Sequence, residues 1–161
     1  AGYGVADLPA ACAVGMPGRG LMTYFLASRE PGRQIENPRQ VSAYRYPPQY
    51  GSKSPSFSRA TLWRETLFVS GTSSVVGHAT LHAGDVQAQL EETLRNLEAV
   101  IARGIACGSL DDVIAAKTYI RHPRDYDRIA RRLASVFPVN LYLEADICRP
   151  DLLVEIEVVA R

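Results

Sequence analysis

Residues 141–160 read LYLEADICRPDLLVEIEVVA, and apolar and polar side chains alternate along both halves of this stretch. Because successive side chains of a strand point to opposite faces, the alternation predicts two strands, Leu141–Cys148 and Leu152–Ala160. The turn residues Arg149-Pro150-Asp151 predict that these strands form a hairpin. One face carries aliphatic side chains that would pack on helices, and the other carries carboxylates, a thiol and a phenol. A solvent-facing sheet tolerates such a polar face, and a binding pocket uses it.

The segments before this hairpin have the pattern of an α+β domain. We expect a strand pair at Ala60–Trp63 and Thr66–Val69, a small-residue loop at 70–74, a helix at Asp85–Arg103, a strand at Val113–Ile120 and a second helix at Asp125–Ser135. An apolar stripe with the period of helix turns indicates the first helix. The order β-β-α-β-α-β-β predicts a mixed sheet with two helices packed on one face.

Residues 1–56 differ from this pattern. Leu21–Ala27 has the length and apolar content of a buried strand, whereas turn residues dominate from Arg29 to Ser58. A loop that long within a small domain is usually functional or disordered. Its aromatic residues and arginines are not typical of disorder and favour an ordered loop that covers a functional site. We therefore divide the chain into an N-terminal strand and long ordered loop, 1–56, and a domain, 57–161.

Composition excludes several classes of protein. The 161 residues include 18 basic and 17 acidic side chains, a net charge of +1 that gives no global field for nucleic acid. No apolar run approaches the roughly 20 residues that span a bilayer, and no signal peptide opens the chain. Cys12, Cys107 and Cys148 lack metal-type spacing and predict free thiols in a reducing compartment. We expect a cytoplasmic protein without nucleic-acid or membrane partners. Residue 1 is not Met, so the chain is either processed or a piece of a longer one.

Short motifs within residues 57–161 carry a first resemblance. They are Val69-Ser70-Gly71-Thr72, Gly84-Asp85-Val86, Thr93-Leu94, Asn96-Leu97, Phe137-Pro138 and Leu153-Val154-Glu155-Ile156-Glu157. In this order they resemble the RidA/YjgF (reactive-intermediate deaminase) fold, which is also chorismate-mutase-like. The resemblance implies an α+β domain whose mixed sheet carries two helices on one face, usually assembled as a homotrimer with pockets between subunits.

The deaminase residues of that family are only partly present. Its members carry a carboxylate-binding arginine two residues after the Pro of the Phe-Pro turn, and here that position is Asn140. Tyr142 stands where a cysteine is expected, although Glu155 matches the glutamate that activates water. These departures argue against imine deamination.

Longer motifs within residues 35–161 resemble the chorismatases, which cleave chorismate into pyruvate and a benzoate or dihydrobenzoate. They are Tyr44-Arg45-Tyr46-Pro47, Tyr50-Gly51, the run SPSFSRA at 54–60, Ser70-Gly71-Thr72, Gly77-His78 and the run DICRPDLLVE at 146–155. Chorismatases carry a degenerate domain before this one. The resemblance therefore implies that 1–56 is a linker from a missing N-terminal domain and that 57–161 is the catalytic domain.

Chorismate is a dianion with two carboxylates and an enol ether, so its pocket needs fixed cations and hydrogen-bond donors. Arginine binds planar carboxylates through a bidentate fork, which makes Arg59 and Arg149 candidates. Glycine allows a carboxylate to approach backbone N–H groups closely. The predicted substrate-binding residues are Tyr50, Phe57, Arg59, Ala60, Gly71, Thr72, Tyr142 and Arg149.

Cleavage of the enol ether needs a proton on the enolpyruvyl carbon, and a carboxylic acid whose pKa is raised by burial can deliver it. Glu155 lies between Val154 and Ile156 on the polar face, and the resemblance implies that it is the catalytic acid/base. Cys148 is the second predicted catalytic residue, since the residues at this position and at Ala60 help choose the product of chorismatases. Cys148 resembles the hydroxybenzoate-forming types and Ala60 the hydrolytic type. We expect 3-hydroxybenzoate, 4-hydroxybenzoate or both.

The resulting hypothesis is a chorismate-cleaving lyase or hydrolase that needs no cofactor. His78 and His82 have no evident third ligand, so we expect no metal site. Beyond the substrate, the expected partner is either further copies in a homotrimer or the missing N-terminal domain. Two alternatives stay open: a RidA-like enamine or imine deaminase, and a non-catalytic binding or assembly module of a longer chorismatase.

Overall fold

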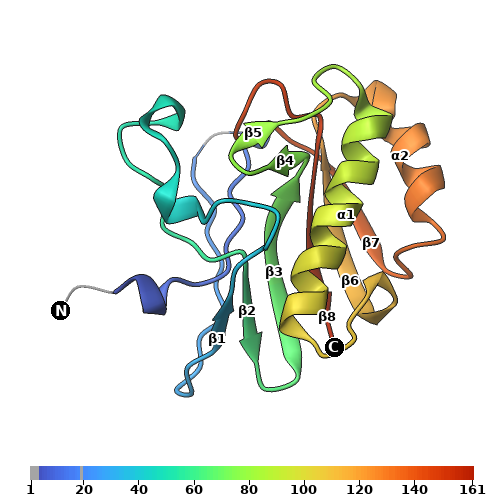
Figure 1. Cartoon of the computed structure of the whole chain (residues 1–161). Coiled ribbons are helices and arrows are strands. Elements are labelled where there is room, and N and C mark those ends of the chain that lie inside the picture. Colours follow the sequence, from blue (N-terminus) through green and yellow to red (C-terminus); the bar gives the residue numbers. More distant parts are fainter. Residues whose placement is uncertain (1–3, 19) are drawn as a thin grey trace.

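The computed structural model describes residues 4–18 and 20–161 and has one mixed sheet with the strand order β1-β2-β3-β8-β6-β7 (Figure 1). Its strands are β1 (Arg33–Ile35), β2 (Ala60–Trp63), β3 (Thr66–Ser73), β6 (Val113–Ile120), β7 (Asn140–Glu144) and β8 (Val154–Ala160). A small ribbon of β4 (Val75–Val76) and β5 (Ala79–Thr80) extends from the end of β3. Neighbouring strands are antiparallel except β6 and β7, which are parallel.

Two helices, α1 (Val86–Gly104) and α2 (Tyr126–Leu133), cover one face of the sheet. The carboxylate of Asp85 accepts a hydrogen bond from the N–H of Ala88 and caps α1, as expected for Asp at a helix start. The described part of the chain also contains five single-turn 3-10 helices: Val5–Asp7, Ala43–Arg45, Pro48–Tyr50, Leu110–Asp112 and Pro123–Asp125. These elements confirm the predicted α+β class and the placement of both helices on one face.

The main core lies between the sheet and α1. Leu90, Leu97 and Ile101 of α1 are completely buried against aliphatic side chains of β3, β6 and β8. Burial of apolar surface at roughly 25 cal/mol per Å² makes this layer the chief source of stability. Ile35 of β1 joins the same core, so a short part of residues 1–56 belongs to the sheet of the domain.

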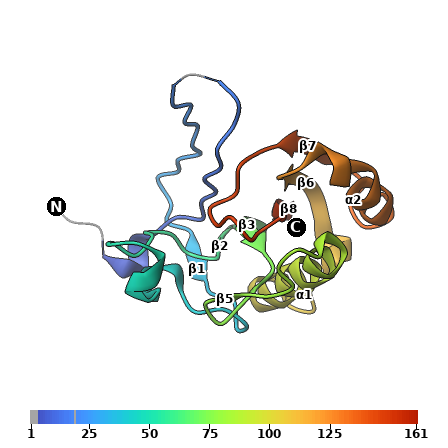
Figure 2. The same ribbon diagram turned by 90° about the horizontal axis from the view of Figure 1, so that it is seen from above.

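The opposite face of the sheet, here called the open face, is covered by neither α1 nor α2. Figure 2 shows the N-terminal part of the chain crossing this side, away from α1, and projecting as a long loop. Because side chains alternate along each strand, Ser73 of β3, Tyr119 of β6 and Glu155 of β8 share this face at one level of the sheet. This is the face on which the candidate site is built.

The prediction of a closing hairpin is wrong. β8 lies between β3 and β6, and β7 is an edge strand that runs parallel to β6. The connection between β7 and β8 is held at the end of β6, where the guanidinium of Arg121 donates to the carbonyls of Ile147, Arg149 and Leu152. Alternation fixes which residues share a face, but it does not specify the neighbouring strand.

The prediction of a buried strand at Leu21–Ala27 is also wrong. These residues form no strand and lie in the projecting loop, where Leu21 is 93% exposed. Tyr24 is the point of attachment that the structure describes, since its hydroxyl contacts Lys117 and Glu157 on the open face. Apolar content alone does not determine whether a segment pairs with a strand of the sheet.

The small residues at 70–74 do not form a loop, contrary to prediction. β3 continues through Ser73, with an irregular register to β8 between Val69 and Thr72. The predicted strand at Val113–Ile120 is confirmed at both ends, and the helix predicted at Asp85–Arg103 is α1 within one residue. The second helix, α2, is shorter than predicted.

Candidate active site

Glu155 is a buried carboxyl group on the open face, with 6% of its surface exposed. Its Oε1 accepts a hydrogen bond from the thiol of Cys12 at 3.2 Å, and its Oε2 accepts one from the hydroxyl of Ser73 at 3.3 Å. Burial raises the pKa of Glu155, the two hydrogen bonds oppose this effect, and the nearby charge of Glu157 adds to it. A carboxyl group in this environment retains its proton at a higher pH than an exposed glutamate and can donate it to a substrate.

Gly71 provides the space that Glu155 and Cys12 occupy. A Cβ atom at position 71 would lie 2.8 Å from Sγ of Cys12 and 2.9 Å from Cδ of Glu155, and it would overlap Oε1. The role of Gly71 in the structure is therefore to admit these two side chains. The next residue, Thr72, was also predicted to bind substrate, but its side chain points to the opposite face. It pairs with Ile156 on the core face, and its hydroxyl donates to the carbonyl of Ser70 at 2.8 Å.

Arg59 directly precedes β2 and is only 5% exposed. One terminal nitrogen donates to the carbonyl of Val41 at 2.8 Å and to the hydroxyl of Tyr46 at 2.6 Å. The guanidinium also lies over the rings of Tyr46 and Phe57, 5.4 and 5.5 Å from their centroids. Aromatic faces attract a cation without neutralising its charge.

Arg149 lies on the connection between β7 and β8 and is 9% exposed. It donates to the carbonyl of His78 at 2.8 Å and to the hydroxyl of Thr80 at 3.3 Å. Its guanidinium is 4.0 Å from the ring centroid of Tyr50 and 5.2 Å from that of Tyr46. Tyr46 therefore lies under both arginines and joins them into one cationic cluster.

Neither guanidinium of this cluster is neutralised by an acidic side chain of the residues that the structure describes. Among the described residues, no Asp or Glu oxygen lies within salt-bridge distance of Arg59 or Arg149, and the buried Nε of Arg59 has no hydrogen-bond partner. Burying a positive charge without a counterion is costly. The arrangement is therefore suited to an anionic ligand.

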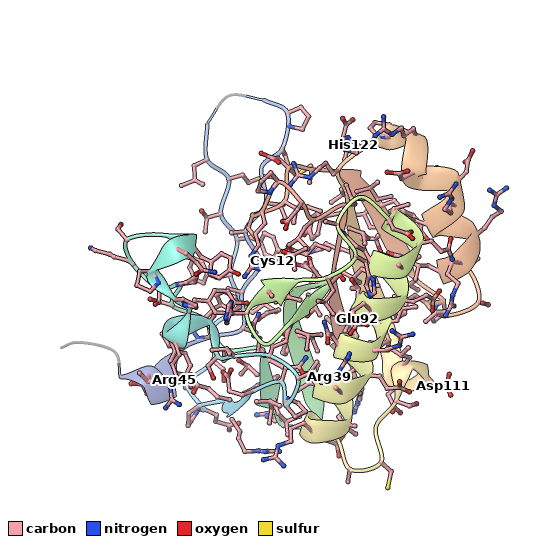
Figure 3. All side chains as sticks on the ribbon, turned by 45° about the horizontal axis from the view of Figure 1, so that its top comes forward. Cys12, Arg39, Arg45, Glu92, Asp111 and His122 are labelled. Atoms are coloured by element: carbon pink, nitrogen blue, oxygen red, sulfur yellow. The ribbon has the colours of Figure 1, made fainter. Side chains whose placement is uncertain are left out.

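Glu92 on α1 provides the contrast. Its buried carboxylate binds Arg39 at 2.6 Å and Arg95 at 2.7 Å, and Figure 3 shows Arg39 and Glu92 close together beside α1. Burial acts to raise the pKa of Glu92, but the hydrogen bonds from the two arginines outweigh it and lower the pKa. Both arginines are thus paired with an acidic side chain of the protein itself, and the cluster is structural.

Cys148 connects the two parts of the site. Although the residue is exposed at the surface, loss of water contacts on its protein-facing side raises the pKa of the Cys148 thiol; the charge of Glu155 raises it further, and the charges of Arg149 and Arg59 act in the opposite direction. The thiol therefore lies within electrostatic reach of the carboxyl group and of both guanidinium groups. The sequence-predicted residues Glu155, Cys148, Arg59, Arg149, Tyr50, Phe57 and Gly71 are brought together on this side of the molecule.

Three predicted binding residues have side chains elsewhere. Tyr142 faces the helices and packs edge-on against Tyr126, with ring centroids 5.4 Å apart, and burial raises its pKa. The hairpin prediction placed it on the polar face, whereas Leu141 occupies that face and is 53% exposed. The methyl group of Ala60 is fully buried in the main core, as strand alternation requires next to an outward-facing Arg59. Thr72 is the third.

Sequence reasoning missed Cys12, Tyr46 and Ser73 as members of the site. Tyr46 lies within the motif Tyr44-Arg45-Tyr46-Pro47, so its place under Arg59 was accessible from the resemblance. Ser73 was assigned to a loop. Cys12 had no signal, because it lies in a segment without periodicity; Figure 3 places it among the side chains between that segment and the sheet.

Within the described residues, no three His, Cys, Asp or Glu side chains are grouped as metal ligands. His78 instead lies with Nδ1 3.2 Å from the Tyr50 hydroxyl, and His82 is 3.7 Å from Glu92. Across residues 4–18 and 20–161, no helix combines the length and the apolar character needed to cross a membrane.

Comparison with known proteins agrees with the geometry. Residues 52–161 match the family model described as Endoribonuclease L-PSP. A 3-hydroxybenzoate synthase of Streptomyces hygroscopicus is 42% identical over 170 residues, which cover 94% of this chain and 50% of the relative. A chorismatase of Streptomyces rapamycinicus is 42% identical over 175 residues, covering 97% of this chain and 52% of the relative. The chain thus spans about half the length of the curated relatives it matches.

Solved structures give the same result. A chorismatase crystal structure superposes with a TM-score of 0.84 and 35% identity, covering 98% of this chain and 52% of that one. A Rid-family protein from Yersinia pestis superposes with a TM-score of 0.58 and 22% identity, covering 65% and 86% of the two chains, and shows the fold alone. The predicted RidA/YjgF-like fold and the resemblance to chorismatases are both confirmed.

Proposed function

The chain belongs to the Endoribonuclease L-PSP family, and we propose that it is the chorismate-cleaving part of a chorismatase that releases pyruvate and a hydroxybenzoate. The observation that carries the proposal is a pair of buried guanidinium groups, those of Arg59 and Arg149, that have no acidic partner in residues 4–18 and 20–161. They lie on the side of the molecule that also holds the buried carboxyl group of Glu155. Chorismate combines two carboxylates with an acid-labile enol ether, so it requires both features. The names of the relatives support this choice of substrate.

Each part of the site has a role in binding. Arg59 and Arg149 bind the two carboxylates of the substrate, since hydrogen bonds between charged groups are stronger than those between neutral groups. Tyr46 and Tyr50 hold the guanidinium groups in place through cation–π contacts. Removal of the ring faces would leave the arginines free to turn towards solvent.

The chemical step begins with the proton of Glu155. The carboxyl group transfers this proton to the methylene carbon of the enolpyruvyl group, which becomes the methyl group of pyruvate. The bond between the ring carbon and the ether oxygen then breaks, its electron pair goes to the oxygen, and the oxygen becomes the keto group. The ring loses a proton as it becomes aromatic, and this proton restores the Glu155 carboxyl group. The atoms of chorismate equal those of pyruvate and hydroxybenzoate, so no water is consumed.

Cys148 acts on the product. Its thiol lies within electrostatic reach of Glu155, Arg149 and Arg59, where it can contact the ring of a bound substrate and bias which hydroxybenzoate forms. We expect no cofactor, because the route draws its proton and its charges from side chains. The homotrimer and the contact with a preceding domain stay predictions.

The proposal is tested by incubating the purified chain with chorismate, following pyruvate with a coupled dehydrogenase assay and identifying the aromatic product by chromatography. We expect pyruvate and hydroxybenzoate in equal amounts, and we expect Cys148→Ala to change the ratio of isomers. A folded chain that binds chorismate without turnover would contradict the proposal in favour of a binding module. Ammonia release from 2-aminoacrylate without cleavage of chorismate would contradict it in favour of a deaminase.

A further inference from the structure

We propose that Cys12 is a positioning residue for Glu155: its thiol holds the carboxyl group in the orientation from which the proton is transferred. This inference rests on the proposed function. The immediate evidence is the hydrogen bond from Sγ of Cys12 to Oε1 of Glu155 at 3.2 Å, opposite the bond from Ser73 to Oε2 at 3.3 Å. The two donors come from different segments and approach the two oxygens separately, so together they define the plane of the carboxyl group.

The backbone around Cys12 is fixed on both sides of the thiol. The N–H groups of Ala10 and Ala11 donate to the hydroxyls of Thr61 and Ser70, each at 2.9 Å. On the other side, Gly15 exchanges two backbone hydrogen bonds with Asp146, at 2.8 and 2.6 Å. These contacts attach residues 10–15 to β2 and β3 at one end and to the connection after β7 at the other. Cys12 is thereby placed over Glu155 with little freedom to withdraw.

The space for the thiol is provided by the sheet itself. Gly71 lies beneath both groups, and a Cβ atom there would meet Sγ of Cys12 at 2.8 Å and would also overlap the Glu155 carboxyl group. A cysteine that merely filled a gap in the core would not need a glycine opposite it that also admits a carboxyl group. The local geometry is specific for the pair Cys12 and Glu155.

The chemical state of Cys12 fits a donor. Burial raises the pKa of its thiol well above the ordinary value, and the charges of Glu155 and Glu157 raise it further. The thiol therefore remains S–H at neutral pH and donates to the carboxyl group, instead of forming a thiolate that would act as a nucleophile. Because this bond stabilises the ionised carboxylate, it opposes the effect of burial on Glu155 and makes its proton easier to release.

Other groups that face the pair must be held constant in a test. They are Glu157 on β8, Tyr119 on β6, Ser73 on β3, Cys148 on the connection before β8 and Arg59 next to β2. Lys117 binds Glu157 and contacts Tyr24 at the edge of this group. Substitutions confined to position 12 leave all of these side chains in place.

The test compares Cys12→Ala, Cys12→Ser and the control Cys107→Ser, in which an exposed thiol far along the sequence is changed. We expect kcat of Cys12→Ala to fall about tenfold, the effect of losing one hydrogen bond to a charged group, with KM little changed. In Cys12→Ala the pKa of Glu155 rises further, so the loss of activity with increasing pH moves to higher pH. Cys12→Ser keeps a hydrogen-bond donor, so its kcat and the pH at which its activity is lost should both return towards the wild-type values.

A second readout does not depend on turnover. Infrared spectra recorded during a pH titration report the protonated carboxyl band of Glu155, identified by its absence in Glu155→Gln, and the S–H stretching band of Cys12. We expect the carboxyl titration to move upwards in Cys12→Ala and the S–H band to change as Glu155 ionises. An unmoved carboxyl titration with an unchanged pH profile would overturn the inference. If wild type did not cleave chorismate, the proposed function would fail, and the infrared titration would still decide whether Cys12 controls Glu155.

Discussion

Gly71 and Glu155 lie on adjacent strands so close together that no side chain fits between them. Any Cβ atom at position 71 would overlap Oε1 of Glu155 and crowd Sγ of Cys12. The glycine at position 71 of β3 is thus explained by the carboxyl group that it faces. A site residue on one strand and a glycine on its neighbour form a single structural feature.

The substitution Gly71→Ala tests this feature. The added methyl group must displace the Glu155 carboxyl group, and a displacement of about 1 Å at a reacting group can cost on the order of 100-fold in rate. We expect kcat for chorismate cleavage to fall by that order and the free energy of unfolding to fall by about 1–3 kcal/mol from overpacking. Both are measured at a temperature below the unfolding transition, by turnover and by denaturant titration. Wild-type kcat in Gly71→Ala would show that the position of Glu155 is not critical.

Arg59→Gln tests the cationic cluster. The buried guanidinium has no acidic partner among the described residues, so its loss removes a contact to the ligand rather than a structural ion pair. We expect the Kd for chorismate to rise about 10- to 150-fold, because hydrogen bonds to charged groups contribute roughly 1.5–3 kcal/mol. Calorimetric titration measures this Kd. The control is Arg64→Gln, whose exposed guanidinium binds Glu30 at 3.1 Å, and it should bind chorismate as wild type does. Equal losses in both variants would argue against a specific role for Arg59.

The pKa of Glu155 makes stability depend on pH. Burial raises this pKa above the ordinary value of 4.5, so the folded protein retains a proton that the unfolded chain has already lost. The free energy of unfolding of wild type therefore falls as the pH rises from 4.5 through the raised pKa. Glu155→Gln lacks this dependence, so its Tm should increase relative to wild type over that range. A constant difference in Tm between the two proteins would show that Glu155 titrates as an ordinary glutamate.

Glu92→Gln should behave in the opposite way and serves as the matched buried glutamate. Hydrogen bonds from Arg39 and Arg95 outweigh burial and lower the pKa of Glu92, so its stabilising effect is present above the ordinary value of 4.5 and is lost as the pH falls through the lowered pKa. We expect Glu92→Gln to reduce the free energy of unfolding by about 1–3 kcal/mol at neutral pH. Its turnover per folded molecule should equal that of wild type. Denaturant titrations at neutral and acidic pH measure the first effect, and a selective loss of kcat would contradict the assignment of Glu92 as structural.

The sequence was most informative where one residue pattern had one structural cause. Val113–Ile120 forms β6 at the predicted bounds, and α1 follows its apolar stripe and its Asp85 cap, because both patterns are local. Glu155 was predicted as a site residue from motif and strand alternation, and Arg59 from its motif, and both stay predictions. The strands next to β8 were not predicted correctly, because alternation shows which residues share a face and not which strands are neighbours. For the same reason the assignment of Tyr142 to the polar face was wrong.

The remaining errors concern contacts between segments distant in sequence. Cys12 reaches Glu155 across 143 positions of the chain, and only the hydrogen bonds that attach its segment to β2 and β3 place it there. Leu21–Ala27 has the composition of a strand, yet it pairs with no strand of the sheet and projects into solvent. Neither the contact of Cys12 with Glu155 nor the exposure of residues 21–27 can be predicted from a periodic pattern in the sequence.

In the proposed function, the Glu155 carboxyl group supplies the proton that cleaves chorismate. The most direct measurement is single-turnover release of pyruvate from chorismate by wild type and by Glu155→Gln at equal concentrations of folded protein. The amide of Gln cannot donate a carboxylic proton but keeps the shape of the side chain, so chorismate should still bind. We expect rapid release by wild type and a loss of at least about 100-fold in the variant, the range of general acid catalysis. Release by Glu155→Gln at the wild-type rate would contradict it.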